Sequence, residues 1–328
     1  MVTALLKTGR FWLGSLMLAC MLVVLAAPLA ASAHPVVALA DPLVGYGAGT
    51  TGGQGGSTVT VSNLSSFTSA VSGSTARTVL LNGTLTLSGQ VKVGSNKTIL
   101  GVGVHSGLTG GGLDLDGVSN VIIRNLTISF AKGTDDITII RGTNHVWVDH
   151  NEFYSDRSHG KDYYDGQVDI TRQSDYVTVS WNRFHDHYKT SLVGHSDSFS
   201  VDTGHLHVTY HHNWFYNVGS RAPSLRFGTG HVYNNYFQNI DTSAVHSRMN
   251  AQMLIENNVF RNVKLAVTTT GDSKTDGYVN MSGNDLGGAP VDITRTGNFT
   301  HAPYSYTLDP ASSVISEVTA YSGVGVID

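Results

Sequence analysis

A short segment recurs along the middle of this 328-residue chain, and it restricts the fold more than any other feature. Five copies share an apolar, β-prone run followed by Asn, any residue and Phe, and they recur every 22 to 31 residues. A weaker copy lies at residues 121–128. Repeats of this length are typical of solenoids, in which each repeat forms one coil that stacks on the last. No long amphipathic helical pattern interrupts the short runs of Val, Ile, Thr and Tyr. The chain is therefore predicted to be all-β, with the architecture of a parallel β-helix.

The repeated Asn and Phe have a structural explanation in such a stack. Asn at an equivalent turn of each coil tolerates left-handed backbone and can hydrogen-bond the coils above and below, while Phe stacks inside. We assign a structural role, in preference to sugar binding, to Asn151, Asn182, Asn213, Asn235 and Asn258. The open ends of the stack need covers, and residues 67–71 are predicted to form a short capping helix.

The N-terminus has the pattern of a secretory signal peptide. Lys7 and Arg10 precede an apolar run from residue 11 to about residue 30, and Ala31-Ser32-Ala33 follows as a small-residue cleavage site. We interpret residues 1–33 as the signal, with cleavage as late as residue 40 as a second option and an uncleaved membrane anchor as the alternative. The protein is thus expected to be secreted and extracellular, without membrane attachment after cleavage.

The mature chain must be stabilised by its core, because its single cysteine, Cys20, lies in the signal. No Pro-rich, Ser-rich or charged linker divides the remainder, so residues 41–328 are predicted to form one domain. A solenoid with covered ends needs no partner, and we expect a monomer.

The net charge narrows the classes of partner. The signal carries two positive and no negative charges, so its removal takes the formal net charge from -4 to about -6. A net acidic protein does not attract a polyanion through its global field, so any such attraction needs a local basic cluster or a bound cation. Nucleic acid is not an expected partner.

An acidic turn followed by basic residues indicates the chemistry. Asp165 and Asp169 suit a hard cation with oxygen ligands, and Lys189, Arg221 and Arg226 suit an anionic polymer. In a regular strand two residues four apart are separated by about 13 Å, too far to share one ion. The segment must therefore bend, and Gly166 is the residue that permits it.

Five motifs, taken in order, resemble the signature of pectate lyases of polysaccharide lyase family 1. These motifs are Asn96–Gly101, Val146–His150, Asp165–Ile170, Val177–Asn182 and Arg221–Arg226. The resemblance extends from about residue 45 to about residue 288. It implies a secreted, right-handed, single-stranded parallel β-helix that cleaves α-1,4-polygalacturonate by calcium-dependent β-elimination. The expected products are 4,5-unsaturated oligogalacturonates.

The resemblance also implies residue roles. Asp165 and Asp169, with Asp136 as the third, match the calcium ligands of the family, and Arg221 matches the base that removes the C5 proton. Lys189 and Arg226 match the groups that bind substrate carboxylates.

Two positions depart from the family pattern. Thr134 stands where many relatives have a further Asp, so Asp135 could partly substitute and the ligand count is open. Thr171 replaces a common Lys, and we expect Arg172 to compensate.

Other functions remain as alternatives. A polygalacturonase would use grouped carboxylates for hydrolysis, a pectin lyase would act on methylesterified pectin without metal, and a non-catalytic β-helix would only bind polysaccharide. Arg and Lys follow the acids in the sequence, and this combination of acidic and basic residues favours the calcium-dependent lyase. Histidines in residues 185–187, 205–207 and 211–212 suggest zinc, but their scatter favours hydrogen-bonding roles.

Overall fold

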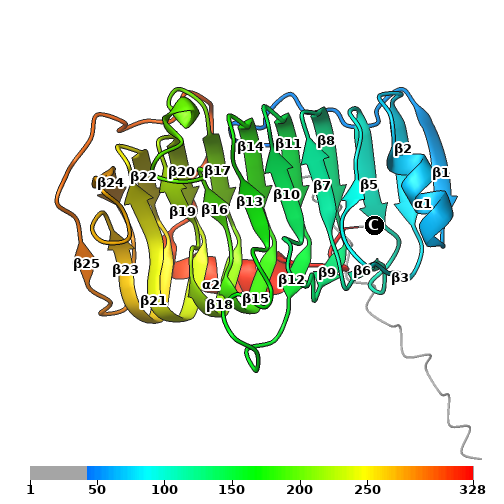
Figure 1. Ribbon diagram of the computed structural model, residues 1–328. Helices are drawn as coiled ribbons and strands as arrows, with labels where there is room; N and C mark the ends of the chain where they lie inside the picture. Colours follow the sequence, from blue (N-terminus) through cyan, green and yellow to red (C-terminus); the bar gives the residue numbers. More distant parts are fainter. Residues whose placement is uncertain (1–42, 328) are drawn as a thin grey trace, which may run out of the picture. The chain divides into compact units, whose positions relative to one another are not determined.

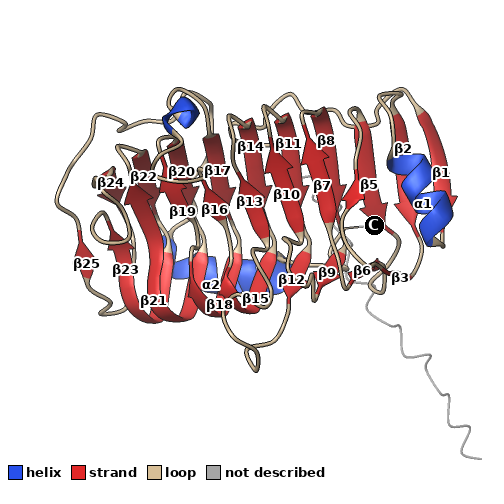
Figure 2. Cartoon of the chain, viewed as in Figure 1, coloured by secondary structure: helices blue, strands red, loops and turns tan. Residues whose placement is uncertain are grey.

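The computed structural model describes residues 43–327, which form a stack of coils made from short strands (Figures 1 and 2). Each coil in the middle of the stack contributes one strand to each of three faces. The first face is a ten-stranded sheet of β1 (Ser57–Val61), β2 (Arg77–Leu81), β5 (Lys97–Gly101), β8 (Ser119–Arg124), β11 (Asn144–Asp149), β14 (Asp175–Ser180), β17 (His207–His211), β20 (Thr229–Tyr233), β22 (Gln252–Glu256) and β24 (Tyr278–Ser282).

The other two faces join through a long strand that turns the corner between them, β21 (Tyr236–Arg248). The second face contains β3 (Thr84–Thr86), β6 (Gly107–Thr109), β9 (Thr127–Ser129), β12 (Glu152–Tyr154), β15 (Arg183–Lys189), β18 (Trp214–Ser220) and β23 (Val259–Thr268). The third contains β4 (Val91–Lys92), β7 (Leu113–Asp116), β10 (Ile137–Ile140), β13 (Val168–Ile170), β16 (Leu192–Val193), β19 (Ser224–Arg226) and β25 (Val291–Asp292). All of these strands pair in parallel, which confirms the predicted parallel β-helix.

The repeated Phe residues stack in the core. Successive rings lie 4.6 to 5.3 Å apart between centroids, and their planes are nearly parallel. The stack consists of Phe153, Phe184, Phe215, Phe237 and Phe260, all of them fully buried. Because each ring covers the next, one residue type at one repeat position gives a continuous apolar core.

The repeated Asn side chains form a buried ladder, as predicted. Asn182 Nδ2 donates to Asn213 Oδ1 at 3.0 Å, and the same oxygen accepts from the backbone N–H of Asn182 at 3.0 Å. The pattern repeats from coil to coil and reaches Asn284, beyond the five predicted positions. The ladder therefore satisfies the polar groups of a turn that has no access to water.

One detail of the ladder prediction was wrong. The ladder asparagines were expected to occupy the left-handed turn position, but the left-handed residue is the one before each of them. His150, Trp181 and His212, for example, have φ of 51°, 54° and 55°. The ladder position thus uses the amide for hydrogen bonding, and the conformational requirement is met by its neighbour.

A helix covers the N-terminal end of the stack, as predicted. Helix α1 (Leu64–Val71) begins at Asn63, whose side chain accepts from the backbone N–H of Ser66 at 2.9 Å. Its Phe67 and Val71 are fully buried. The helix thus closes the open end of the core.

After β25 the chain turns back along the outside of the stack (Figure 1). This C-terminal segment (residues 293–327) contains α2 (Ala311–Tyr321), whose Val314 and Val318 are buried against Tyr236 and Val259. A single 3₁₀ turn, η1 (Ser200–Asp202), lies before β17. None of the helices in residues 43–327 has the length and apolar character of a membrane span. The predicted signal peptide falls outside the described residues.

Candidate active site

Most of the predicted site residues lie on strands of the third face or in the turns that lead into these strands. In this sheet Thr138 of β10 is in register with Asp169 of β13, and Arg226 of β19 is in register with Arg248 of β21. Side chains alternate along each strand, so Asp169 faces outward between two fully buried neighbours. The sheet therefore arranges acids and bases in rows that run from coil to coil.

Asp135 and Asp169 converge at Gly166. The backbone N–H of Gly166 donates to Asp135 Oδ1 at 2.9 Å, and the Thr138 hydroxyl donates to Asp135 Oδ2 at 2.7 Å. Asp169 Oδ1 accepts from the backbone N–H of Leu192 at 2.9 Å. A Cβ atom at position 166 would lie only 2.5 Å from Asp169 Oδ1 and 2.9 Å from Asp135 Oδ1. The absence of a side chain at Gly166 is thus what allows the two carboxylates to approach.

Asp165 lies at the outer edge of this group and is paired with a lysine. Lys189 Nζ is 2.9 Å from Asp165 Oδ1 and 3.0 Å from Asp162 Oδ1. The Asp165 side chain is 55% exposed, whereas that of Lys189 is 14% exposed. The predicted metal ligand and the predicted substrate-binding lysine therefore share one ion pair at the boundary between the acids and the bases.

In residues 43–327 the carboxyl of Asp136 takes no part in the hydrogen bonds and ion pairs that join these acids. It is 3% exposed, and its Oδ2 atom has no hydrogen-bond partner among the described residues. Burial and the neighbouring charge of Asp135 raise its pKa well above the usual range. The assignment of Asp136 as the third metal ligand stays a prediction, and the contacts favour its neighbour Asp135.

The acidic group favours a cation for an electrostatic reason. Burial raises the pKa of Asp135, and burial together with the charge of Asp135 raises the pKa of Asp169 well above the usual range. Neighbouring carboxylates repel one another when both are ionised. A positive charge between or beside them stabilises their ionised forms. All the donors are carboxylate oxygens, which are the ligands that calcium prefers. The residues therefore fit a hard divalent cation in kind.

Arg221 occupies the turn before β19 and has left-handed backbone, with φ of 61°. Its carbonyl oxygen accepts from the backbone N–H of Ser191 at 2.7 Å and from the hydroxyl of Thr190 at 2.5 Å. The peptide bond between Ala222 and Pro223 is cis. These contacts fix the backbone of Arg221, while its side chain lines a groove on the sheet.

Arg226 is held by a partly exposed acid, Asp197. Its Nε atom is 2.7 Å from Asp197 Oδ1, and its NH1 group donates to the carbonyl of Gly194 at 3.1 Å. Burial alone would raise the pKa of Asp197, but hydrogen bonds from Arg226, Lys274 and Ser273 lower it to about 2. The acid is therefore ionised throughout the neutral range and positions the guanidinium.

The groove beside these residues has a volume of about 920 Å³ and a basic lining. Besides the predicted Lys189, Arg221 and Arg226, it is lined by Arg248, His246, Lys161 and Lys264. Burial, followed by repulsion from Arg226, lowers the pKa of Arg248 to about 10, which leaves it charged at neutral pH. Such a surface suits a polymer with a carboxylate on each unit.

Arg248 was missed from the sequence, although a signal for it exists. It follows Arg226 by 22 residues, the same interval that separates Asn213 from Asn235 in the ladder. Residues one repeat apart are in register on adjacent coils, so the repeat itself predicts a second arginine beside Arg226.

The expected compensation for Thr171 is not supported by the contacts. Thr171 is buried, and Arg172 is turned to His195, with its NH2 group 3.1 Å from the ring Nε2. Its guanidinium also lies over the ring of Phe199 at 5.6 Å from the centroid. Arg172 is not among the residues that line the groove.

The chain is similar to known proteins of one family. A family model described as pectate lyase matches residues 14–327. Pectate lyase B of Colletotrichum gloeosporioides is 50% identical over 283 residues, which cover 85% of this chain and 84% of that protein. A pectate trisaccharide-lyase of Bacillus licheniformis is 43% identical over 295 residues, with 85% and 84% covered.

Solved structures agree with the sequence comparisons. A pectate lyase from Bacillus sp. N165, crystallised in complex with trigalacturonate, superposes with a TM-score of 0.80 at 34% identity. The match covers 87% of this chain and all of that one. Pectate lyase II of Xanthomonas campestris superposes with a TM-score of 0.76 at 31% identity over 87% of this chain and 98% of that chain.

Proposed function

This chain belongs to the pectate lyase family, and we propose that it cleaves polygalacturonate by calcium-dependent β-elimination at the acids of β13 and the groove lined by β18, β19, β21 and β23. The observation that carries the proposal is the juxtaposition of three carboxylates with a row of cations. Asp135 and Asp169 meet at Gly166, and Asp165 is paired with Lys189. Lys189 in turn lines the groove together with Arg221, Arg226 and Arg248. A hydrolase would not need this combination, whereas elimination next to a uronate carboxylate does.

Asp135, Asp165 and Asp169 would hold the calcium ion. A bound cation that also contacts the uronate carboxylate withdraws charge from it and makes the neighbouring C5 hydrogen more acidic. Asp169 is fixed for this role by Leu192, and Asp135 by Gly166 and Thr138. Asp165 has to exchange part of its contact with Lys189, which then becomes available to the substrate.

Arg221 is proposed to remove the C5 proton, and the glycosidic oxygen at C4 leaves as the C4–C5 double bond forms. A guanidinium ordinarily gives up its proton only above about pH 12, so the rate is expected to rise toward alkaline pH. The fixed backbone of Arg221 keeps the side chain in the groove during this step.

Lys189, Arg226 and Arg248 are proposed to bind carboxylates of the polymer. Arg226 and Arg248 are in register on adjacent coils, so two cations face the same stretch of groove. Their charge also stabilises the negative charge that develops on the reacting uronate. The matching pectate lyase that was solved with trigalacturonate supports an oligogalacturonate ligand.

Secretion and the monomeric state belong to the proposal as well. The basic, apolar and small-residue pattern of residues 1–33 supports export. Export would bring the enzyme to its polymeric substrate outside the cell.

The test is ultraviolet absorbance of unsaturated products from polygalacturonate and from highly methylesterified pectin. We expect product from polygalacturonate in calcium, none with excess chelator, and loss of product in Arg221→Ala. Product from the esterified polymer that is insensitive to chelator would instead indicate a pectin lyase. Binding of both polymers without product would indicate a non-catalytic β-helix.

A further inference from the structure

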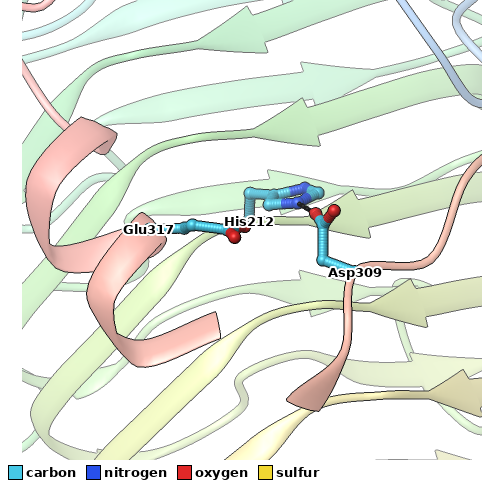
Figure 3. A group of neighbouring side chains, drawn as sticks. All are labelled: His212, Asp309 and Glu317. Atoms are coloured by element: carbon cyan, nitrogen blue, oxygen red, sulfur yellow. Dashed lines mark hydrogen bonds and ion pairs between the residues drawn. The ribbon is translucent and has the colours of Figure 1, made fainter. Parts of the chain in front are cut away.

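Three side chains that are far apart in sequence converge where the C-terminal segment crosses the stack. Figure 3 shows His212 at the end of β17, Asp309 just before α2, and Glu317 on α2. One potential ligand atom from each of the three lies within 4.8 Å of those from the other two. Nε2 of His212 is 2.7 Å from Asp309 Oδ2. This group lies apart from the residues that line the catalytic groove.

The imidazole is held in place on two sides. The ring of His212 stacks on that of Trp181 at 4.2 Å between centroids, and its Nδ1 is 2.9 Å from Nδ1 of His211. The side chain of His212 is 9% exposed. A metal-binding histidine typically has its second ring nitrogen fixed by a hydrogen bond in this way, which leaves the other nitrogen for the ion.

The hydrogen bond between the two histidines bears on which nitrogen is available. Nδ1 of His211 lies 2.9 Å from Nδ1 of His212 and can accept a hydrogen from it. In the tautomer that donates this hydrogen, His212 presents Nε2 without a hydrogen to the carboxylate of Asp309, 2.7 Å away. A lone pair facing a carboxylate is stable only with a proton or a cation between them.

The backbone of Asp309 is also fixed in advance. Its carbonyl oxygen accepts from Nδ2 of Asn234 and from Nδ2 of Asn257, both at 2.8 Å, and its N–H donates to Asn234 Oδ1 at 3.0 Å. Both asparagines precede ladder positions and have left-handed backbone. The stack itself therefore positions the carboxylate.

The charge of the group is not balanced by protein cations. In residues 43–327 neither Asp309 nor Glu317 forms an ion pair with an arginine or lysine, and His212 is the one basic partner of Asp309. A carboxylate oxygen of Asp309 lies within 4.8 Å of one of Glu317, so two like charges meet at this point. A divalent cation would allow both to stay ionised.

We propose that His212, Asp309 and Glu317 form a binding site for a divalent transition-metal ion, zinc above all, which pins the C-terminal segment to the β-helix. One imidazole and two carboxylates are ligands for zinc, whose bonds to nitrogen and oxygen are about 2.0 to 2.2 Å long. Calcium prefers oxygen ligands alone and is not expected here. The ion would join the end of β17 to α2 through His212 and Glu317, which are 105 positions apart in the sequence. It would therefore stabilise the fold and take no part in the elimination.

The experiment is calorimetric titration of the metal-free, full-length protein with zinc chloride in saturating calcium, which keeps the groove occupied. We expect one zinc ion per chain and a zinc-dependent rise in melting temperature. Cobalt as a second probe should give the visible absorption bands of a protein-bound ion. Glu317→Gln should weaken zinc binding by at least about tenfold, because even the loss of an outer-shell partner costs about 10- to 100-fold. Glu317 is partly exposed on α2, so this change keeps the helix.

Two further variants and two controls make the result decisive. Asp309→Asn and His212→Gln should weaken zinc binding like Glu317→Gln. His185→Ala removes another histidine that contacts acids, Glu152 and Asp186, and Asp169→Asn removes an acid of the proposed calcium site. Both controls should bind one zinc ion with wild-type affinity. The proposal is overturned if the wild type shows no saturable zinc binding, or if Glu317→Gln and Asp309→Asn bind zinc as the wild type does. Calcium-dependent lyase activity is measured separately, so its presence or absence does not decide this question.

Discussion

Single residues explain why neighbouring acids in this chain have different roles. Asp135 accepts hydrogen bonds from Gly166 and Thr138 beside Asp169, whereas Asp136, the next residue, is almost fully buried with one oxygen unpaired. The motif alone could not separate the two, because they are consecutive and both lie just before β10. The sequence prediction named Asp136, and the hydrogen bonds of the neighbouring Asp135 favour that carboxylate as the ligand instead.

Asp169→Asn should have opposite effects on stability with and without calcium. Because the folded-state pKa of Asp169 is raised, its contribution is favourable below the unfolded-state value near 4 and is lost as the pH rises through the folded-state pKa. In chelator at pH 7 the variant should therefore be more stable than the wild type, and the difference should shrink toward pH 4. With calcium at 100 times its Kd the wild type should gain about 2.7 kcal/mol and the variant less.

Urea unfolding at the two pH values, with chelator and with calcium, measures these differences. Asp116→Asn is a suitable control, because Asp116 pairs with Arg141 at an exposed position and its loss should change stability by no more than about 1 kcal/mol under all conditions. A loss of stability in Asp169→Asn that is the same with and without calcium would contradict the assignment of Asp169 to the metal site.

Gly166→Ala should damage the metal site and leave the fold intact. The added methyl group would contact the carboxylates of Asp169 and Asp135 at less than 3 Å and push them apart. We expect the calcium concentration for half-maximal activity to rise by about tenfold or more. Gly160→Ala is the matched control, since a Cβ there meets no atom within 4 Å. Unchanged calcium dependence in Gly166→Ala would show that the two carboxylates are not joint ligands.

Among the elements, the Asn ladder and the Phe stack carry the fold from one coil to the next. Both were predictable from sequence, because a repeat of Asn, any residue and Phe has no simpler explanation than stacked coils. The sequence prediction placed the left-handed conformation at the ladder asparagine itself. It belongs to the preceding residue, which differs in type from coil to coil and therefore leaves no repeat in the sequence. The third face was harder to predict, because its strands are only two to four residues long over most of the stack.

Asn213→Ala should destabilise the protein strongly. The change removes the acceptor of two hydrogen bonds from Asn182 and the donor to the Val179 carbonyl, all in a buried turn. Each buried group left unsatisfied costs about 1 to 3 kcal/mol, so the free energy of unfolding should fall by at least about 2 kcal/mol. Asn262→Gly, which removes one exposed contact with Asn239 and keeps a residue that tolerates the left-handed φ of 53°, should cost within about 0.5 kcal/mol. Equal urea midpoints for the two variants would contradict the structural role of the ladder.

For the whole molecule, the sequence predicted the solenoid, the acidic turn and three of the groove cations. It did not predict the return of the C-terminal segment along the stack, because contacts such as that of His212 with Asp309 join residues 97 apart without any repeat to indicate them. The same limit hid Lys264 of the groove, whose place depends on the corner that β21 and β23 turn. Local patterns thus predict the coils, and contacts between distant segments require the structure.

The most direct test is a calcium titration of unsaturated product formation from polygalacturonate by the wild type, Asp135→Asn and Asp136→Asn. If Asp135 completes the site with Asp165 and Asp169, Asp135→Asn will need far more calcium than the wild type or will be inactive. Asp136→Asn will follow the wild-type curve, and chelator will abolish the rate of every active form. A wild-type rate that persists in chelator would contradict calcium-dependent elimination. A calcium defect confined to Asp136→Asn would contradict the ligand set.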